Sequence, residues 1–283
     1  MSTASRIEWT QVTWNPVTGC NRISPGCDRC YALTLAARLK AMGQAKYQTD
    51  GDPRTSGPGF GVAIHPGALR EPLSWRKPSL VFVDSMGDLL HAKVPVDFLA
   101  QVWAVMALTP QHTYQILTKR PERYARVLDG PCRCGGGHLP GVHFRRLVQA
   151  HTRRLAPGHQ VELMAHWPLA NVWLGTSIER DDYARRADAL RAAPATTRFL
   201  SLEPLLGPLP SLDLAGIDWV IVGGESGPGY RPLDLDWVRQ IRDRCVGLGI
   251  PLFFKQVGGR TPKAGGRLLD GRTWDQLPPK ANP

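Results

Sequence analysis

Short apolar segments recur along the chain, and the stretches between them have the length and composition of helices or loops. A first segment lies at about residues 11–15, and the later ones are LVFV at 80–83, TYQIL at 113–117, NVWLGT at 171–176, RFLSL at 198–202, DWVIVGG at 218–224 and PLFFK at 251–255. Continuous apolar strands that alternate with helices are typical of a parallel sheet covered on both faces. Seven βα units predict an α/β fold, a partial or complete TIM-type barrel, because no glycine-rich dinucleotide turn follows the first segment.

Polar side chains stand at or directly after the ends of the later predicted strands. They are Asp84, Ser85, Asp88, Thr118, Lys119, Arg120, Ser177, Glu179, Glu203, Glu225, Ser226, Lys255 and Gln256. In a βα barrel these positions share the carboxyl face, where active sites are built. Loops are exposed to solvent, and this alone explains a polar residue at any one of these positions. Six such strand ends beside one cysteine-rich loop, however, predict a functional site.

Three cysteines occupy one short loop after the first predicted strand. Cys20, Cys27 and Cys30 read C-x6-C-x2-C, and the last two stand where a helix begins, so amides and the helix dipole favour thiolates there. A metal site is the leading interpretation, and three unligated buried thiols are the alternative. Structural zinc normally has four protein ligands, whereas a [4Fe-4S] cluster held by three cysteines keeps one iron open. No fourth ligand is near in sequence, since the closest histidine is His65.

The chain carries a net charge of +11, which favours an anionic partner, with nucleic acid the leading candidate. The densest basic cluster is Arg145, Arg146, Arg153 and Arg154, although a solvated helix face explains it equally well. The chain has no run of roughly 18 apolar residues and no signal-peptide pattern, so we expect a cytoplasmic protein without membrane contact. Clustered cysteines in that compartment bind metal or do chemistry more often than they form disulfides.

A second cluster of potential metal ligands lies in the string CRCGGGHLPGVH. Cys132, Cys134, His138 and His143 predict a zinc site there, although C-x-C is not the usual zinc-finger spacing and the glycines also fit a disordered loop. We expect one domain over residues 1–283, with residues 130–167 inserted between the third and fourth strands. Because the arginine cluster follows directly, this segment could form a lid that grips nucleic acid.

Three clustered cysteines after the first strand of a partial barrel resemble the radical S-adenosylmethionine (radical SAM) superfamily. There the open iron chelates the amino and carboxylate groups of the cofactor, and an electron from the cluster cleaves it to a 5′-deoxyadenosyl radical. The usual spacing in that superfamily is C-x3-C-x2-C. The first gap is longer here, and Arg29 stands where an aromatic residue usually precedes the last cysteine.

A closer resemblance covers nearly the whole chain. It is to a phage- and actinobacteria-associated family of unassigned function, itself usually regarded as radical-SAM-like. The strings that carry it are WNPVTGC, SPGCDRCYA, YQTDGDPR, LTKRPER, NVWLGTSIE, SLEPLLGPL, DWVIVGGESGP and FFKQVGG. This resemblance indicates a family without naming a substrate.

The superfamily resemblance implies roles for the polar strand ends. A contact with the cofactor amine falls at Asp84, Ser85 or Asp88, and a ribose contact falls at Ser177 or Glu179. Adenine or carboxylate recognition falls at Gly223, Gly224 and Glu225, although a tight βα turn explains the glycines nearly as well. The predicted catalytic residues are Lys119, Glu203 and Lys255. Lys119, Arg120 and Lys255 would bind an anionic substrate, and Glu203 is alternatively an ion-pair partner for one of them.

Three functions follow from these patterns. The first is a radical SAM enzyme with a [4Fe-4S] cluster and S-adenosylmethionine, acting on an anionic substrate such as DNA, RNA, a nucleotide or a modified base, and needing an electron donor such as flavodoxin or ferredoxin. The second is a non-catalytic nucleic-acid-binding protein with a structural zinc or iron–sulfur site. The third is a non-radical enzyme that uses Glu179, Glu203 and Glu225 as acid–base groups.

Overall fold

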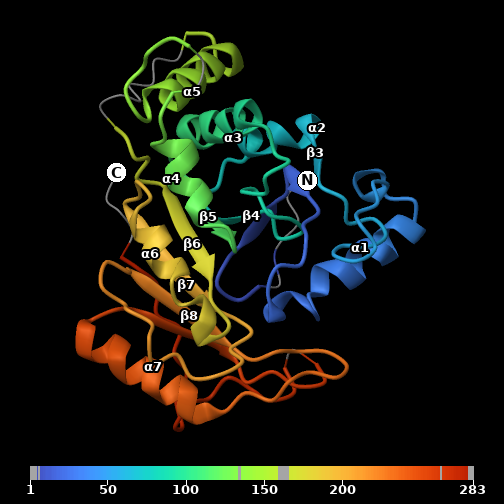
Figure 1. Cartoon of the computed structure of the whole chain (residues 1–283), viewed down its shortest axis with the longest axis vertical. Helices are drawn as coiled ribbons and strands as arrows, with labels where there is room; N and C mark the ends of the chain where they lie inside the picture. The colour runs from blue at the N-terminus through green and yellow to red at the C-terminus, as the bar shows by residue number, and fades with distance from the viewer. Residues whose placement is uncertain (1–4, 6, 133–134, 159–165, 262, 280–283) are drawn as a thin grey trace.

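The computed structural model is an α/β fold built on one open sheet of seven parallel strands (Figure 1). It describes residues 5, 7–132, 135–158, 166–261 and 263–279. The sheet follows chain order, so each connection returns the chain to the next position in a single direction. The strands are β1 (Val12–Trp14), β4 (Leu80–Val83), β5 (Thr113–Thr118), β6 (Val172–Ser177), β7 (Thr197–Leu202), β8 (Trp219–Gly223) and β9 (Leu252–Gln256).

Helices connect most neighbouring strands and cover the outer face of the sheet. Helix α1 (Tyr31–Ala41) packs in a separate cluster with Phe60 and Met86. The helices on the outer face are α2 (Pro66–Leu69), α3 (Val96–Leu108), α4 (Glu122–Leu128), α5 (Val142–Leu155), α6 (Arg186–Arg191) and α7 (Leu235–Leu248). The main core lies between these helices and the sheet, with Leu99, Trp103 and Met106 of α3 fully or almost fully buried in it. Burying one such side chain stabilises the fold by roughly 1.5–3 kcal/mol.

The inner face of the sheet shows that the sheet curls into part of a barrel. The ring centroid of Trp9 lies 4.7 Å from that of Phe82 on β4 and 6.2 Å from that of Trp219 on β8. On a flat sheet β4 and β8 would be roughly 19 Å apart, because neighbouring strands are separated by about 4.8 Å. Gly175 of β6 leaves the space that the Phe199 ring fills, since a Cβ there would lie 2.4 Å from the ring. Aromatic rings thus fill the inner face along the strands.

The barrel is partial. Among the described residues, β1 and β9 each pair with one strand of the main sheet. The outer edge of β9 is covered by the C-terminal segment, where the amide of Phe254 donates to the carbonyl of Trp274 (2.7 Å) and the amide of Gln276 donates to Leu252 (3.1 Å). Covering an edge strand in this way removes a site for aggregation. A small antiparallel sheet of β2 (Val17–Thr18) and β3 (Ala63–Ile64) lies beside the first strand.

The segment between β5 and β6 contains α4 and α5. Helix α5 packs on α3, with the rings of Trp103 and Phe144 5.7 Å apart. The arrowheads of β5 and β6 point away from α5 in Figure 1, so α5 lies in the outer layer and not over the carboxyl ends of these strands. The carboxyl ends of the strands form one end of the barrel, called the mouth below. The arginine cluster on α5 therefore does not form a lid over the mouth. The boundaries of a single domain and of the insertion at 130–167 stay predictions.

No helix in the described part of the chain combines the length and apolarity needed to cross a lipid bilayer.

Candidate metal centre at the mouth of the barrel

The three cysteines lie on a loop that crosses the carboxyl side of the sheet. Gly19 begins this loop with a φ of +85°, and a Cβ there would lie 2.1 Å from the carbonyl oxygen of Gly61, so only glycine fits. The amide of Gly19 donates to the carbonyl of Met86 (2.9 Å) in the loop after β4. A short 3₁₀ helix, η1 (Pro25–Cys27), turns the chain before α1. The loop is therefore held against the ends of the strands from its first residue.

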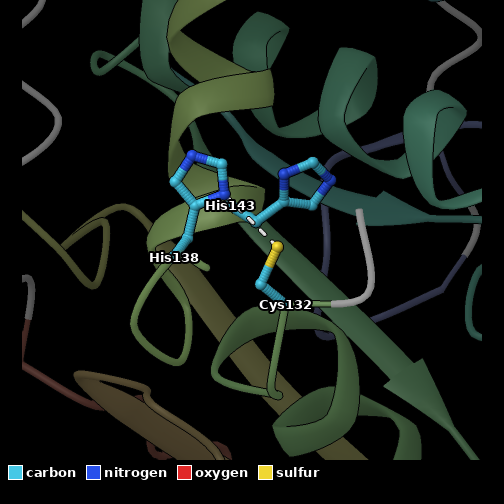
Figure 2. A group of neighbouring side chains, drawn as sticks. All are labelled: Cys132, His138 and His143. Carbon is cyan, nitrogen blue, oxygen red and sulfur yellow. Dashed lines mark hydrogen bonds between the residues drawn. The ribbon is translucent and has the colours of Figure 1, made fainter. Parts of the chain in front are cut away.

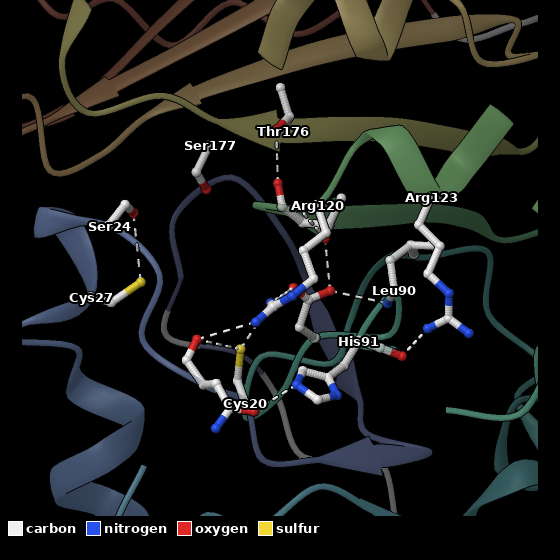
Figure 3. A network of polar contacts seen from close by, with 12 residues as sticks. Cys20, Ser24, Cys27, Leu90, His91, Arg120, Arg123, Thr176 and Ser177 are labelled. Atoms are coloured by element: carbon white, nitrogen blue, oxygen red, sulfur yellow. Dashed lines mark hydrogen bonds and ion pairs between the residues drawn. The ribbon is translucent and has the colours of Figure 1, made fainter. Parts of the chain in front are cut away.

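The thiol of Cys20 lies in a network of polar contacts with residues after β4 and β5 (Figure 3). Nη1 of Arg120 donates to Sγ of Cys20 (3.3 Å) and also to Oδ2 of Asp88 (2.6 Å). Asp88 accepts a second hydrogen bond from the hydroxyl of Thr118 (2.7 Å). Burial and the charge of Asp88 raise the pKa of the Cys20 thiol to about 12, although Arg120 opposes them. A positively charged donor thus already faces this sulfur.

Cys27 and Cys30 lie at the other end of the loop. The hydroxyl of Ser24 and Sγ of Cys27 are 3.7 Å apart, which Figure 3 shows at the left. Cys30 is the N-cap of α1, and burial raises the pKa of its thiol while the amide of Ala32 opposes this. The charge of Cys27 also acts on Cys20 and on Cys30, so Cys27 lies within electrostatic range of both. All three cysteines are partly exposed.

The spacing of these thiols differs from that of a single-ion site. Ligands of a tetrahedral zinc lie about 3.4–3.8 Å from one another, given bonds of about 2.0–2.3 Å. The sulfur atoms of Cys20, Cys27 and Cys30 do not all lie within 4.8 Å of one another, whereas the ligand atoms of one other group among the described residues do. The structure therefore does not hold the three thiols at the spacing of ligands to a single ion.

Glu179, which follows β6, holds the cysteine loop onto the barrel. Its carboxylate is fully buried and lies 3.0 Å from Nζ of Lys119 and 3.0 Å from Nη1 of Arg186. The amide of Gly26 donates to the same carboxylate (3.3 Å). Burial raises the pKa of Glu179, but Lys119, Ser24 and Arg186 outweigh it and leave this pKa below its ordinary value. The group is therefore an anion at neutral pH that binds the loop backbone.

Glu225, which follows β8, holds the loop from the opposite side. Its carboxylate accepts hydrogen bonds from the amide (2.8 Å) and the guanidinium of Arg231 and from Nη1 of Arg29 (3.2 Å). Nη2 of Arg231 also donates to the carbonyl of Pro25 (3.0 Å). Burial raises the pKa of Glu225, but the hydrogen bonds from Arg231 and Arg29 leave it below the ordinary value. Two arginines thus join β8 to the cysteine loop.

Glu203, which follows β7, and Lys255, near the end of β9, form a partly exposed ion pair. Nζ of Lys255 lies 2.6 Å from Oε1 of Glu203, and their side chains keep 18% and 20% of their surface exposed. Nε2 of Gln256 donates to the same oxygen (3.2 Å). A Cβ on Gly223 would lie 3.3 Å from Glu203, so the missing side chain leaves room for this carboxylate. Both side chains of this pair are partly exposed, whereas the Glu179 carboxylate that binds Lys119, another predicted catalytic residue, is fully buried.

The other predicted cofactor-binding residues have contacts within the protein. Asp84, at a φ of +58°, accepts a hydrogen bond from the amide of Val17 (2.9 Å), and burial raises its pKa well above the ordinary value. The hydroxyl of Ser85 donates to Oδ1 of Asn15 (3.1 Å), and Ser177 is buried at the end of β6. A Cβ on Gly224 would lie 1.9 Å from the carbonyl oxygen of Val257, so the protein's own backbone requires this glycine. Their roles toward a cofactor stay predictions.

Some residues of the site carried no signal in the sequence. Arg29 stood out only as a departure from the superfamily's cysteine motif, and its contact with Glu225 was not predicted. The contacts of Arg231 were not predicted either, and the hydrogen bond between His91 and Asn21 joins residues 70 positions apart. The glycine- and proline-rich string GPGYRP around Arg231 is the one local sign of a loop with a constrained path. Long-range pairs of this kind leave no periodic pattern from which they can be found.

A cavity of about 600 Å³ borders the cysteine loop. It lies between Pro25, the segment at 180–182 after β6, the segment at 206–210 after β7, and Arg231 with Pro232. The cavity therefore opens at the same end of the barrel as the cysteines.

The imidazole of His91 contacts the cysteine loop. Its Nε2 lies 2.7 Å from Oδ1 of Asn21, and its Nδ1 accepts a hydrogen bond from the amide of Lys93 (3.2 Å), so the neutral ring fits this position. Burial, together with the charge of Arg120, lowers the pKa of His91 from 6.5 to about 4. The charged groups that act on the ring are Arg120, Asp88, Lys93 and Arg123.

This histidine predicts an acid-sensitive stability. Because its pKa is lower in the folded protein, the unfolded chain takes up the proton first, and stability is lost as the pH falls from 6.5 to about 4. The loss is on the order of 3 kcal/mol, at about 1.4 kcal/mol per pH unit. His91→Gln keeps a donor for Asn21 without a titrating ring and should flatten this part of the profile. Denaturant unfolding at a series of pH values measures it, and identical profiles for both proteins would contradict the prediction.

The fold and the site define a partial parallel α/β barrel with a three-thiol loop across its carboxyl end. The chain belongs to the family described as "Protein of unknown function (DUF5131)", which matches residues 4–278. No curated protein matches it. Similar solved structures include spore photoproduct lyase complexed with dinucleoside spore photoproduct (TM-score 0.44, 10% identity) and a cysteine-to-serine mutant of that lyase (TM-score 0.45, 11% identity). Each match covers 86% of this chain and 63% of the lyase chain, so this chain spans less than two thirds of their length.

Proposed function

We propose that this protein is a radical S-adenosylmethionine enzyme that holds a [4Fe-4S] cluster on Cys20, Cys27 and Cys30. The observation that carries the proposal is the position of three partly exposed thiols on one loop across the carboxyl end of a partial parallel barrel. Barrels of this kind build their active sites at that end. The resemblance of the cysteine loop to the radical SAM superfamily supports the same assignment.

The donor set fits such a cluster. Three thiols leave one iron without a protein ligand, and their spacing exceeds that of a single-ion site. Arg120 donates to Sγ of Cys20, and although burial raises the pKa of Cys30, the charge of Lys119 opposes this rise. Cationic groups of this kind favour the thiolates that a cluster requires. When bound, the cluster would supply one electron to the sulfonium cofactor on its open iron.

The residues around the loop would fix its shape and leave one polar pair for a ligand. Glu179 and Glu225 bind the loop through Gly26 and Arg29, so their charges are already used within the protein. Glu203 and Lys255 are partly exposed near the ends of β7 and β9, and Lys255 would bind a carboxylate or phosphate by displacing its contact with Glu203. We therefore assign ligand binding first to this pair.

An exposed basic rim favours an anionic substrate. The rim comprises Arg22, Arg54 and Lys93, all of which are exposed. The amide of Arg22 donates to the carbonyl of Thr55 (2.9 Å), next to Arg54, and the charge of Lys93 acts on Asp52 in the same turn. The rim therefore lies beside the cysteine loop, near Cys20. A nucleic acid, nucleotide or modified base is the substrate class that we propose.

Anaerobic reconstitution with iron and sulfide tests the enzyme assignment. We expect a brown protein that forms 5′-deoxyadenosine from S-adenosylmethionine when a reductant such as reduced flavodoxin is added. A colourless protein with one zinc ion in the mouth would contradict the proposal. A brown protein without cofactor cleavage would favour a non-catalytic nucleic-acid-binding protein with an iron–sulfur site.

The rim predicts a salt-dependent interaction with nucleic acid. Replacing Arg22 and Lys93 together by alanine should weaken binding of a single-stranded oligonucleotide and lower the slope of log K against log salt by about 1.4, at about 0.7 per phosphate contact. Fluorescence anisotropy over a salt series measures this slope. Arg153→Ala, an exposed residue of α5 in the outer layer, is the matched control. A slope that changes with the control and not with the rim would place the nucleic-acid surface on α5 instead.

A further inference from the structure

A second group of potential metal ligands lies between α4 and α5, in the outer layer of the fold (Figure 2). The Sγ of Cys132 and one ring nitrogen each of His138 and His143 lie within 4.8 Å of one another. No other three His, Cys, Asp or Glu side chains in the described part of the chain meet this spacing. Cys134, predicted as a further ligand, lies outside the described residues. We propose that Cys132, His138 and His143 bind one zinc ion.

The backbone brings these ligands together without a metal. The amide of Gly141 donates to the carbonyl of Gly130 (3.0 Å), which closes the loop between α4 and α5 at its neck. Both positions require glycine: a Cβ on Gly130 would lie 2.0 Å from the carbonyl oxygen of Arg126, and Gly141 has a φ of +73°. Cys132 lies two residues after Gly130, and His143 lies two residues after Gly141. The hydrogen bond between the two glycines therefore brings Cys132 and His143 close together. The site is therefore preformed by the loop geometry.

The donor set favours zinc. One thiolate and two imidazoles are borderline-soft ligands of the kind that zinc prefers, and hard cations such as Mg²⁺ and Ca²⁺ take oxygen ligands instead. Sγ of Cys132 already lies 3.3 Å from Nδ1 of His138, close to the separation of about 3.4–3.8 Å between the ligands of a tetrahedral zinc. The rings of His138 and His143 are stacked, with their centroids 5.7 Å apart. Ligand movements of about 1 Å would complete the geometry.

Arg146 sets the protonation state of His138 before metal binds. Nη1 of Arg146 donates to Nε2 of His138 (2.6 Å), so the ring proton is on Nδ1, which faces Cys132. A metal ion on Nδ1 requires the other tautomer, with the proton on Nε2. Because Arg146 is exposed, its side chain can leave the ring when zinc replaces the proton between Cys132 and His138. Removing Arg146 should therefore leave zinc affinity unchanged or raise it.

The ion would stabilise the loop between α4 and α5. Gly135, Gly136 and Gly137 contribute no side chains, and Leu139 is 74% exposed. Helix α5 begins at Val142, and its N-cap, Gly141, provides no side-chain cap. A metal that joins the loop to the first turn of α5 stabilises both, because the unfolded chain has no preformed site. Three protein ligands leave the fourth position of a tetrahedral zinc to water. The site is separate from the barrel mouth.

The test uses the full chain with Cys20, Cys27 and Cys30 replaced by serine, so that the mouth holds no thiol. We expect one equivalent of zinc by elemental analysis, and a thiolate-to-metal charge-transfer band when cobalt(II) replaces it. Cys132→Ser and His143→Ala in this background should each weaken zinc binding by more than about 100-fold, since second-shell changes alone cost about 10–100-fold. Arg146→Gln and His166→Ala, at two exposed side chains, are the controls and should keep full zinc.

Two results would overturn the site: a background protein without zinc or cobalt binding, or zinc content that Cys132→Ser leaves unchanged. Far-UV circular dichroism checks that each variant is folded. The outcome does not depend on a cluster in the mouth, because the background protein lacks those cysteines.

Discussion

Replacing Cys27 by alanine is expected to remove the iron–sulfur cluster and all cleavage of S-adenosylmethionine. Cys27 lies within electrostatic range of both Cys20 and Cys30, so its loss would leave only these two thiols on the loop as ligands. A cubane cluster that already lacks one protein ligand would then be held by two. Iron and sulfide content should fall at least about tenfold, since second-shell changes alone cost about 10–100-fold. Metal analysis and visible spectra after anaerobic reconstitution measure it.

Cys245→Ala is the matched control for this variant. Cys245 is fully buried in α7 among the apolar side chains of the main core and is not part of the cysteine loop. The control should keep its full iron content and cofactor cleavage. Full iron content in Cys27→Ala would refute the ligand assignment, whereas equal loss in both variants would point to general unfolding.

The strands were predictable because continuous apolar runs are a local signal. The string DWVIVGG at 218–224 contains β8 (Trp219–Gly223), and the other six segments likewise overlap strands of the sheet. The choice between a partial and a complete barrel had no such signal, because it depends on whether the two edge strands pair. The segment around Trp274 occupies the edge of β9 instead. Strands β2 and β3 have two residues each, too few for an alternating pattern to be read.

The location of the candidate site could be predicted from the sequence, but not which of its side chains bind one another. Polar strand ends converge at the mouth because the carboxyl ends of parallel strands share one edge. Gly26 and Glu179, however, are 153 positions apart, and no spacing rule selects this carboxylate over Glu203 or Glu225. Several polar ends bind one another, as Lys119 does with Glu179, because buried charges require partners. The catalytic and cofactor-binding roles stay predictions.

Replacing Glu179 by glutamine is expected to lower the free energy of unfolding by about 3 kcal/mol, because removing one partner of a buried ion pair leaves an uncompensated charge. The fully buried carboxylate binds both Lys119 and Arg186. Glutamine keeps the shape of the side chain, so the loss would come from the charge. The amide of Gly26 would also lose a charged acceptor, so the cysteine loop should be less protected from hydrogen exchange. Denaturant unfolding and hydrogen-exchange mass spectrometry measure the two effects.

The pH dependence of this variant separates charge from packing. The pKa of Glu179 lies below its ordinary value of 4.5, so its stabilisation is present above that pH and is lost as the pH falls through the folded pKa. The difference between wild type and Glu179→Gln should therefore shrink on acidification. Glu8→Gln, at an exposed glutamate, should change stability by less than about 0.5 kcal/mol at any pH. If Glu179→Gln were as stable as this control at neutral pH, the ionised carboxylate would not be what holds the cysteine loop on the barrel.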